Sequence, residues 1–360
     1  MEEKVILSIC IPSHNRVDVI LENLKDILKV SDDRFDIIIT DSSNYKGELD
    51  KLLEIKDKRV KIFRNNVNCT AMENWFQAIE NGDGIFAIHL NDRDKIVSDN
   101  LQKFLTYLDM HHMFSGGVCK EVSNSDEAKE FYGTKDAMMN MAYFDLHPTG
   151  IVFNLKCWRK ISDRKELFSY EKSGYFPHDI VLGRLALMGD MFIYQNCIWK
   201  MASPEFCKKN LSGTGMRNFF EPSERLFALQ CCLRELEKAK INQDLRKNKY
   251  MQTIETHLNL ATVGYFHYKE TEFEAIHFGY SIQKFNMMEK MGKIREVLKM
   301  YKRELGLVKE DYSKIKKWTY KNFFVTELRK RTLWLKNRNV RKFLRTLNTK
   351  RKSKEGSLLR

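Results

Sequence analysis

The sequence lacks the features that mark membrane-spanning, secreted and disulfide-stabilised proteins. No uninterrupted apolar run approaches the ~18 residues that are needed to cross a bilayer. The start, MEEKVILSIC, is acidic and then strand-like, so it does not resemble a signal peptide. The eight cysteines form no CxxC pair and no regular framework, which favours free thiols in a reducing cytoplasm.

Net positive charge is absent from most of the chain and concentrated at its end. The formal net charge is +14, yet residues 312–360 hold 17 Lys and Arg against two acids, which leaves −1 for the preceding 311 residues. A hydrophobic content of 43% indicates a globular body rather than a disordered one. The basic tail therefore predicts a polyanionic partner, either an anionic membrane surface or a nucleic acid.

Strand-like and helix-like segments alternate through the first 110 residues. The strand-like runs cover 4–11, 35–40, 59–63 and 84–90, and helical spacing covers 17–30, 48–55, 70–79 and 101–108. This alternation predicts a largely parallel, open α/β sheet. From about residue 221 to 312 the pattern is mostly helical, with no proline after Pro222 and no internal repeat.

Polar clusters follow three of these strands, at PSHNR, DSSN and NDRD. The carboxyl ends of strands are where open α/β sheets bind ligands, so this placement favours a nucleotide-type ligand. Asp92 and Asp94 lie one residue apart after the fourth strand. Two such acids are typical of a solvated surface turn, or of a divalent cation that holds a phosphate.

Four segments together resemble a family 2 glycosyltransferase of the GT-A fold: LSICIPSHNR, IIITDSSN, the LNDRD cluster and HDIVLGRLALMGD. The resemblance covers about residues 5–200. It implies an inverting enzyme of the hexosyltransferase type that uses a nucleotide-diphosphate sugar and Mn²⁺ or Mg²⁺.

The resemblance also implies donor-site roles. Asp92 and Asp94 match the DXD element that holds the metal, with Asp92 also close to the ribose, and Asp41 matches the acid that binds a uracil ring. Thr40 replaces a second acid there, which leaves the base less defined. The remaining donor-side candidates are Pro12, Ser13, Asn15 and Asn74. Ser13 or Asn15 would equally serve as a helix cap, and Asn74 as a structural residue.

Asp179 matches the family's general base, the carboxylate that takes the proton from the attacking hydroxyl. His178 stands where the family usually has Glu, and an aspartate at this position is also typical of a helix N-cap. His147 and His178 are the acceptor-side candidates, with a core role as the alternative for His147.

Two basic segments have a predicted role. Lys208 and Lys209 precede Gly213 and Gly215, so this segment is expected to close over the diphosphate, or else to be an exposed linker. Residues 340–347, VRKFLRTL, place apolar side chains at i, i+3, i+4 and i+7. That spacing with basic flanks favours a helix on an anionic membrane, with packing on the body and nucleic-acid binding as alternatives.

The sequence thus predicts a GT-A domain at 1–215, a helical region at 216–311 and a basic tail at 312–360. We expect a cytoplasmic enzyme, peripheral at the inner face of the cell membrane, that transfers sugar to a glycan or lipid-linked acceptor in cell-surface polysaccharide synthesis. The alternative is an inactive GT-A-like protein that binds nucleic acid through its tail.

Overall fold

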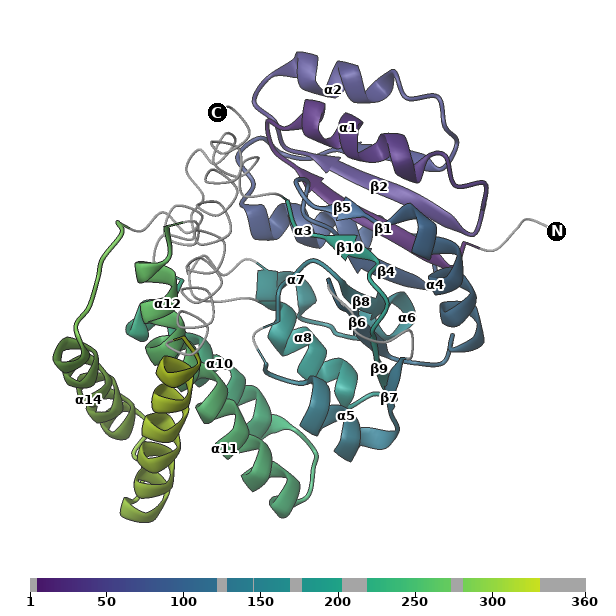
Figure 1. Cartoon of the computed structure of the whole chain (residues 1–360). Helices are drawn as coiled ribbons and strands as arrows, with labels where there is room; N and C mark the ends of the chain where they lie inside the picture. Colours follow the sequence, from purple (N-terminus) through teal and green to yellow (C-terminus); the bar gives the residue numbers. More distant parts are fainter. Residues whose placement is uncertain are drawn as a thin grey trace, which may run out of the picture.

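The computed structural model describes residues 5–121, 128–144, 146–168, 177–202, 219–272 and 281–330 (Figure 1). An eight-stranded sheet has the order β3-β2-β1-β4-β8-β6-β9-β7, and a two-stranded sheet pairs β10 with β5. The strands are β1 Leu7–Ser13, β2 Phe35–Asp41, β3 Val60–Arg64, β4 Phe86–His89, β5 Lys95–Ile96, β6 Gly116–Cys119, β7 Lys129–Phe131, β8 Ile151–Asn154, β9 Met191–Tyr194 and β10 Trp199–Lys200.

The four predicted strands form the parallel half of the large sheet. β1 pairs in parallel with β2 on one side and β4 on the other, and β2 pairs with β3. Every residue of β1 and β2 is buried, as expected for strands covered on both faces. Beyond β4 the sheet is mixed, because β8 runs antiparallel to both β4 and β6.

Helices cover both faces of this sheet. The helices are α1 Val17–Ile27, α2 Lys46–Leu53, α3 Ala71–Glu80, α4 Ser98–Met110, α5 Gly133–Met141, α6 Leu155–Trp158, α7 Arg164–Phe168 and α8 Pro177–Ala186. Helices α1, α2 and α4 share one apolar core with the sheet, and α3, α5 and α8 share the core on the other face. The result is a three-layer α/β/α domain, as the alternating pattern predicts.

A helical region follows this domain (Figure 1). Its elements are α10 Pro222–Lys238, α11 Gln243–Asn259, the π-helical turn η1 Leu260–Gly264, α12 Tyr265–Glu270 and α14 Met287–Glu304, and residues 309–330 are also helical. Ile315 and Phe323 are buried in the same apolar cluster as residues of α10, α11 and α14. The first part of the predicted basic tail is therefore packed into the helical region. Helix α10 also packs against α8, and α11 against α5.

Candidate active site

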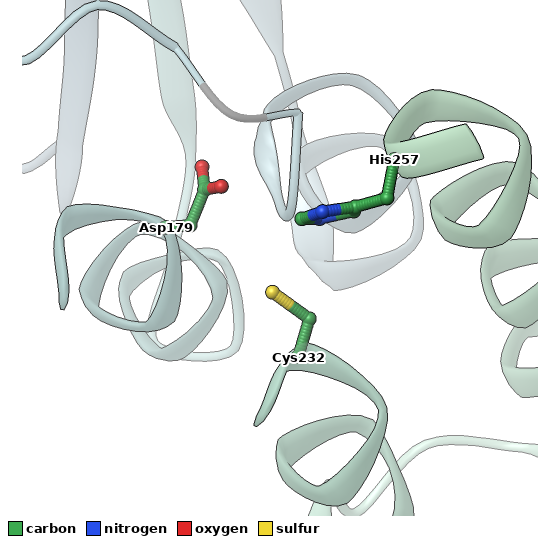
Figure 2. A group of neighbouring side chains, drawn as sticks. All are labelled: Asp179, Cys232 and His257. Atoms are coloured by element: carbon green, nitrogen blue, oxygen red, sulfur yellow. The ribbon is translucent and has the colours of Figure 1, made fainter. Parts of the chain in front are cut away.

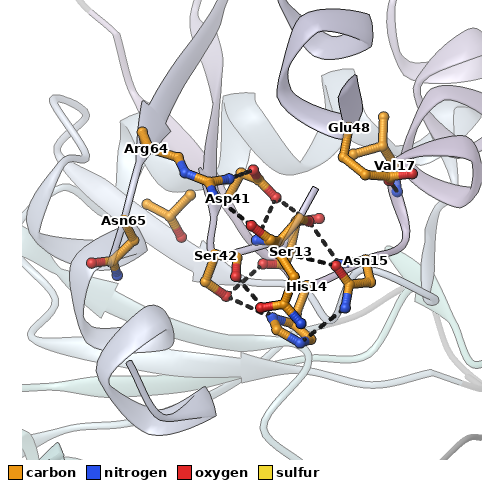
Figure 3. Close-up of polar contacts among 12 residues, drawn as sticks. Ser13, His14, Asn15, Val17, Asp41, Ser42, Glu48, Arg64 and Asn65 are labelled. Atoms are coloured by element: carbon orange, nitrogen blue, oxygen red, sulfur yellow. Dashed lines mark hydrogen bonds and ion pairs between the residues drawn. The ribbon is translucent and has the colours of Figure 1, made fainter. Parts of the chain in front are cut away.

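The carboxyl ends of β1 and β2 meet at one edge, where Ser13 pairs in register with Asp41. The carbonyl oxygen of Ser13 accepts hydrogen bonds from the Asn74 amide at 2.9 Å and from the Ser42 backbone at 3.0 Å (Figure 3). The Ser13 hydroxyl is fully buried, and no described residue hydrogen-bonds it. Such a group is a polar contact available to a bound molecule. Pro12 lies in β1 just before it, beyond the last β1–β4 pair.

The loop between β1 and α1 exposes His14 and Asn15 beside that edge. Asn15 has a φ of 55°, its N–H donates to Ser43 Oγ at 2.7 Å, and its side-chain oxygen accepts from the Asn44 N–H at 2.9 Å. The helix-capping alternative is wrong for this loop, because the N-cap position of α1 is Arg16 and no side chain of the cap residue bonds there. Instead Glu48 accepts from the Val17 N–H at 3.0 Å.

Asp41 lies at the end of β2 and is fully buried. One carboxylate oxygen accepts from the Arg64 guanidinium and the other from the hydroxyl and N–H of Ser43 (Figure 3). The chain therefore balances the charge of Asp41 itself. A nucleobase N–H would share these oxygens, and the predicted uracil contact stays a prediction.

Asn74 lies in α3 and connects the two strand ends. Its amide nitrogen donates to Ser13 O and to Thr40 O at 3.2 Å, and its oxygen accepts from the Asn65 amide at 3.2 Å. The Thr40 hydroxyl in turn donates to the Asn74 carbonyl oxygen at 3.2 Å. These bonds describe a structural role for Asn74, and the donor contact predicted for it stays a prediction.

Asp92 and Asp94 follow β4 in a buried turn, closed by the Asp94 N–H donating to the Asn91 carbonyl at 2.9 Å. Asn23 of α1 donates to the backbone oxygens of both acids at 3.1 Å, which fixes the turn to the α1 side of the sheet. Burial raises the pKa of the Asp92 carboxyl, and the nearby guanidinium of Arg16 lowers it in part. Arg16 Nη1 lies 2.9 and 3.1 Å from the two Asp92 oxygens.

Two of the three partners of Asp94 come from segments far away in sequence. One oxygen accepts from the Thr149 hydroxyl at 2.6 Å and the Asn91 amide at 3.2 Å, and the other accepts from the Ala202 N–H at 3.2 Å. A carboxylate offers about four lone-pair positions. Asp94 thus keeps one acceptor position and Asp92 more than one. Oxygen donors are the ligands that Mg²⁺ and Mn²⁺ prefer, so these two acids fit such an ion and would hold it.

The antiparallel strand β8 brings the HPTG segment to this edge. The Gly150 N–H donates to the His89 carbonyl at 2.9 Å, and its φ of 91° lies in the region that favours glycine. A Cβ at this position would lie only 2.2 Å from Trp199 Nε1, so the absence of a side chain is what lets the backbone approach Trp199. His147 stacks on Trp199 with ring centroids 5.2 Å apart. Burial lowers the pKa of His147 and the charge of Asp94 opposes that change. His147 is thus beside the acid pair, and its acceptor contact stays a prediction.

His178, at the start of α8, is fully buried. Its ring lies 4.8 Å from Trp75 of α3 and 5.5 Å from His89 of β4, measured between centroids. Burial holds the pKa of His178 well below its usual range. The ring therefore packs in the core, and the acceptor role predicted for it is untested. Its contacts place the first turn of α8 next to Trp75 of α3 and the end of β4.

Asp179, the predicted base, lies in the first turn of α8 and is 4% exposed. Cys232 of α10 and His257 of α11 face it (Figure 2), and the potential ligand atoms of the three side chains all lie within 4.8 Å of one another. Buried Lys249 of α11 is also close enough for the charge of Asp179 to act on it. Asp179 thus lies between the α/β domain and the helical region.

Several of these partners escape prediction from the sequence. Arg16 is the last residue of the PSHNR cluster and Arg64 directly follows a predicted strand, so their positions at strand ends were a signal that they could meet the acids. Cys232, Lys249 and His257 carry no such signal, because helical spacing does not show which domain a helix packs on. Lys208 and Lys209 lie outside the described residues, as does the segment 340–347.

Comparison with known proteins supports the glycosyltransferase class that the sequence motifs predict. The sequence model of Glycosyl transferase family 2 matches residues 8–155. These residues form a family 2 domain of the GT-A fold, and the protein is a glycosyltransferase. No curated protein sequence matches the chain.

Crystal structures of S. aureus TarS share the fold. A structure of TarS 1-349 has 13% sequence identity and a TM-score of 0.57, over 88% of this chain and 90% of that one. The complex of TarS 1-349 with UDP-GlcNAc gives 13% identity and a TM-score of 0.58 over the same shares of the two chains. A longer TarS structure gives 11% and 0.55, over 88% of this chain and 54% of that one. A coverage of 88% extends into the helical region, which lies outside the sequence resemblance.

Proposed function

We propose that the protein is an inverting glycosyltransferase that moves a hexose from a UDP-linked sugar to a hydroxyl of a glycan or lipid-linked acceptor. The buried acid pair Asp92 and Asp94 carries this proposal, because it lies at the carboxyl end of β4, next to the strand that ends at Ser13. The Ser13 hydroxyl offers a polar contact at the same edge. The complex of TarS with UDP-GlcNAc on the same fold supports a uridine nucleotide.

In this proposal the Asp92 and Asp94 site serves the departing diphosphate, and Asp179 serves the attacking hydroxyl. A bound Mn²⁺ or Mg²⁺ supplies positive charge opposite the diphosphate. Asp179 accepts the proton of the acceptor hydroxyl, whose oxygen attacks the anomeric carbon from the face opposite the diphosphate. The bond from that carbon to the diphosphate oxygen breaks, and the nucleoside diphosphate leaves with the bonding electrons. The configuration at the anomeric carbon is thereby inverted.

A panel of nucleotide sugars that includes UDP-GlcNAc tests this function through metal-dependent hydrolysis of the donor. We expect hydrolysis of at least one UDP-linked sugar with Mn²⁺ and its loss with a chelator. Equal rates with and without the chelator would remove the metal from the proposal. Hydrolysis of only non-uridine donors would be consistent with a glycosyltransferase but would overturn the proposed uracil contact of Asp41.

We further propose a cytoplasmic location at the inner membrane face and a role in cell-surface polysaccharide synthesis. Within the described residues, no helix is long and apolar enough to span a bilayer. Residues 331–360 hold 11 Lys and Arg against one Glu, and such a segment gains about 1 kcal/mol per basic residue near an anionic surface.

Deleting residues 331–360 tests the membrane proposal without removing the packed helix at 309–330. The shortened protein should leave anionic liposomes and still hydrolyse the donor. If the full chain ignored those liposomes but bound RNA or DNA tightly at the same salt concentration, the tail would be a nucleic-acid-binding segment instead.

A further inference from the structure

We propose that Arg16 exchanges partners when the donor binds. Its guanidinium balances the charge of Asp92 in the free protein, and it moves to the donor diphosphate when a metal ion binds Asp92. This inference rests on the proposed function of the acid pair and deepens it. It gives a role to the last residue of the PSHNR cluster, to which the sequence motifs assign none.

The first observation is that the two acids have different kinds of partner. Arg16 Nη1 lies 2.9 Å from one carboxylate oxygen of Asp92 and 3.1 Å from the other. The oxygens of Asp94 accept instead from neutral groups, which are two side chains and one backbone N–H. The Asp92 side chain is only 7% exposed, so its charge needs a partner within the fold. Among the described residues, Arg16 is the partner that hydrogen-bonds these two oxygens.

The second observation is the position of Nη1 itself. A nitrogen in contact with both oxygens of one carboxylate takes the position from which a cation would chelate that carboxylate. A guanidinium at this distance also repels a divalent ion that approaches the same oxygens. Arg16 and a metal ion therefore compete for Asp92, whereas the neutral partners of Asp94 offer no such competition.

The third observation is that the Arg16 guanidinium has donors left for a second partner. Its Nε and Nη2 make no hydrogen bond to a described residue, and the side chain is 26% exposed. Arg34 and Asp32 form an ion pair of similar burial, with 30% and 7% of the side chains exposed. That pair uses two guanidinium nitrogens, Nε at 3.1 Å and Nη2 at 2.8 Å. The pair of Arg16 with Asp92 uses one nitrogen and is the more easily exchanged.

The backbone of Arg16 fixes the side chain beside the donor edge. Arg16 follows Ser13 by three residues, and its carbonyl oxygen accepts from the N–H groups of Val19 at 3.1 Å and Ile20 at 3.2 Å. The start of α1 is thus anchored, while rotation about the side-chain bonds can re-aim the guanidinium. Guanidinium groups bind phosphate oxygens through two N–H groups at once. A diphosphate next to the acid pair is therefore the partner that fits a guanidinium displaced from Asp92.

Arg16→Met tests the exchange through two affinities of the full chain that should change in opposite directions. Without nucleotide at pH 8, Mn²⁺ binding should tighten about tenfold, because the competing cation is gone, and electron paramagnetic resonance of the free ion measures it. At saturating Mn²⁺, the affinity for UDP should fall about tenfold, because the diphosphate loses a charged contact, and calorimetry measures it. The affinity for uridine, which has no phosphate, should stay unchanged.

Arg34→Met is the matched control, because it removes an arginine of similar burial from an ion pair outside the acid pair. It should change neither affinity. Arg16→Lys keeps the positive charge and should keep the weaker Mn²⁺ binding of the wild type. In an Asp92→Asn background, Arg16→Met should no longer tighten Mn²⁺ binding, because the carboxylate for which the two cations compete is gone.

Three results would overturn the inference. A loss of both affinities in Arg16→Met would indicate a structural role, and an unchanged Mn²⁺ affinity would mean that the ion binds without displacing Arg16. An unchanged UDP affinity, or an equal loss for uridine and UDP, would exclude the phosphate contact. If the wild type bound no Mn²⁺ even with UDP present, the metal site of the proposed function would itself fail, and the inference with it.

Discussion

The protein has two buried carboxylate sites, and the groups that surround the negative charge differ between them. Asp92 and Asp94 are held by the α/β domain itself, through Arg16, Thr149 and Asn91. Asp179 instead faces side chains of α10 and α11, in the helical region. The first site is therefore complete within one domain, whereas the second requires the helical region to be docked.

The difference has a functional consequence. A site that holds the donor is expected to survive changes in the helical region, because none of its described partners comes from there. The proposed base Asp179, which faces α10 and α11, should respond to changes at the interface with the helical region. Variants at Asp179 and its neighbours should therefore change transfer while nucleotide binding persists, and variants at Asp94 should change the metal-dependent step.

Asp179→Ala should have the largest effect. Losing a general base lowers the transfer rate by about 10²–10⁴-fold, while affinity for the nucleotide persists, since the base serves the acceptor hydroxyl. Transfer kinetics and calorimetric titration with UDP measure the two quantities. Asp163→Ala is the control on the same side of the protein, because Asp163 pairs with Arg184 of α8 and is half exposed. A collapse of UDP affinity in Asp179→Ala would make it a donor-site or structural residue.

Asp94→Asn should lower turnover by about 10²–10³-fold, because the site loses a charge opposite the diphosphate. The Asn oxygen still accepts from Thr149, but its NH2 group cannot accept from the Ala202 N–H, so the free energy of unfolding should fall by only about 1–3 kcal/mol and the fold should be kept. Hydrolysis at saturating Mn²⁺ measures the effect. The exposed Asp83→Asn, which loses only a surface ion pair with Lys61, is the control. Near-normal metal-dependent activity in Asp94→Asn would refute the metal assignment.

Lys249→Met should stabilise the protein, by an amount that depends on pH. Because the pKa of Lys249 falls from 10.5 to about 7 on folding, burial of the cation costs more than the attraction to Asp179 returns. The unfolded chain binds the extra proton between these values, so the penalty is complete below pH 7 and fades as pH rises to 10.5. The free energy of unfolding should rise by about 1–4 kcal/mol at pH 6 and by less at pH 9. Urea denaturation at both pH values measures it, and an equal gain at both would contradict the sign.

The sequence predicts the strand ends around Ser13, Asp41 and Asp92 well and the neighbours of Asp179 poorly, for a physical reason. β1, β2 and β4 alternate with α1, α2 and α3, and each polar cluster follows its strand directly, so local periodicity places Ser13, Asp41 and Asp92 at one edge. Thr149, a partner of Asp94, lies just before the antiparallel strand β8, and the neighbours of Asp179 come from helices about 50 or more residues later. Such contacts depend on packing between segments, which periodicity does not encode.

Gly183→Ala should have the smallest effect, confined to the Asp179 side. A Cβ at Gly183 of α8 would lie 2.4 Å from the ring of Tyr143, whose own backbone has a φ of 59°. The ring would have to move, which costs about 1–3 kcal/mol of unfolding free energy and disturbs the surroundings of Asp179. UDP affinity should stay unchanged, since the three atoms nearest to the added Cβ all belong to Tyr143 and none to a donor-side candidate. The matched control is Gly292→Ala in α14, where a Cβ meets nothing within 4 Å and alanine gains up to about 1 kcal/mol of helix propensity. If both variants gained stability, Tyr143 would have room to shift, and the packing that presents Asp179 would be looser than the geometry at Gly183 implies.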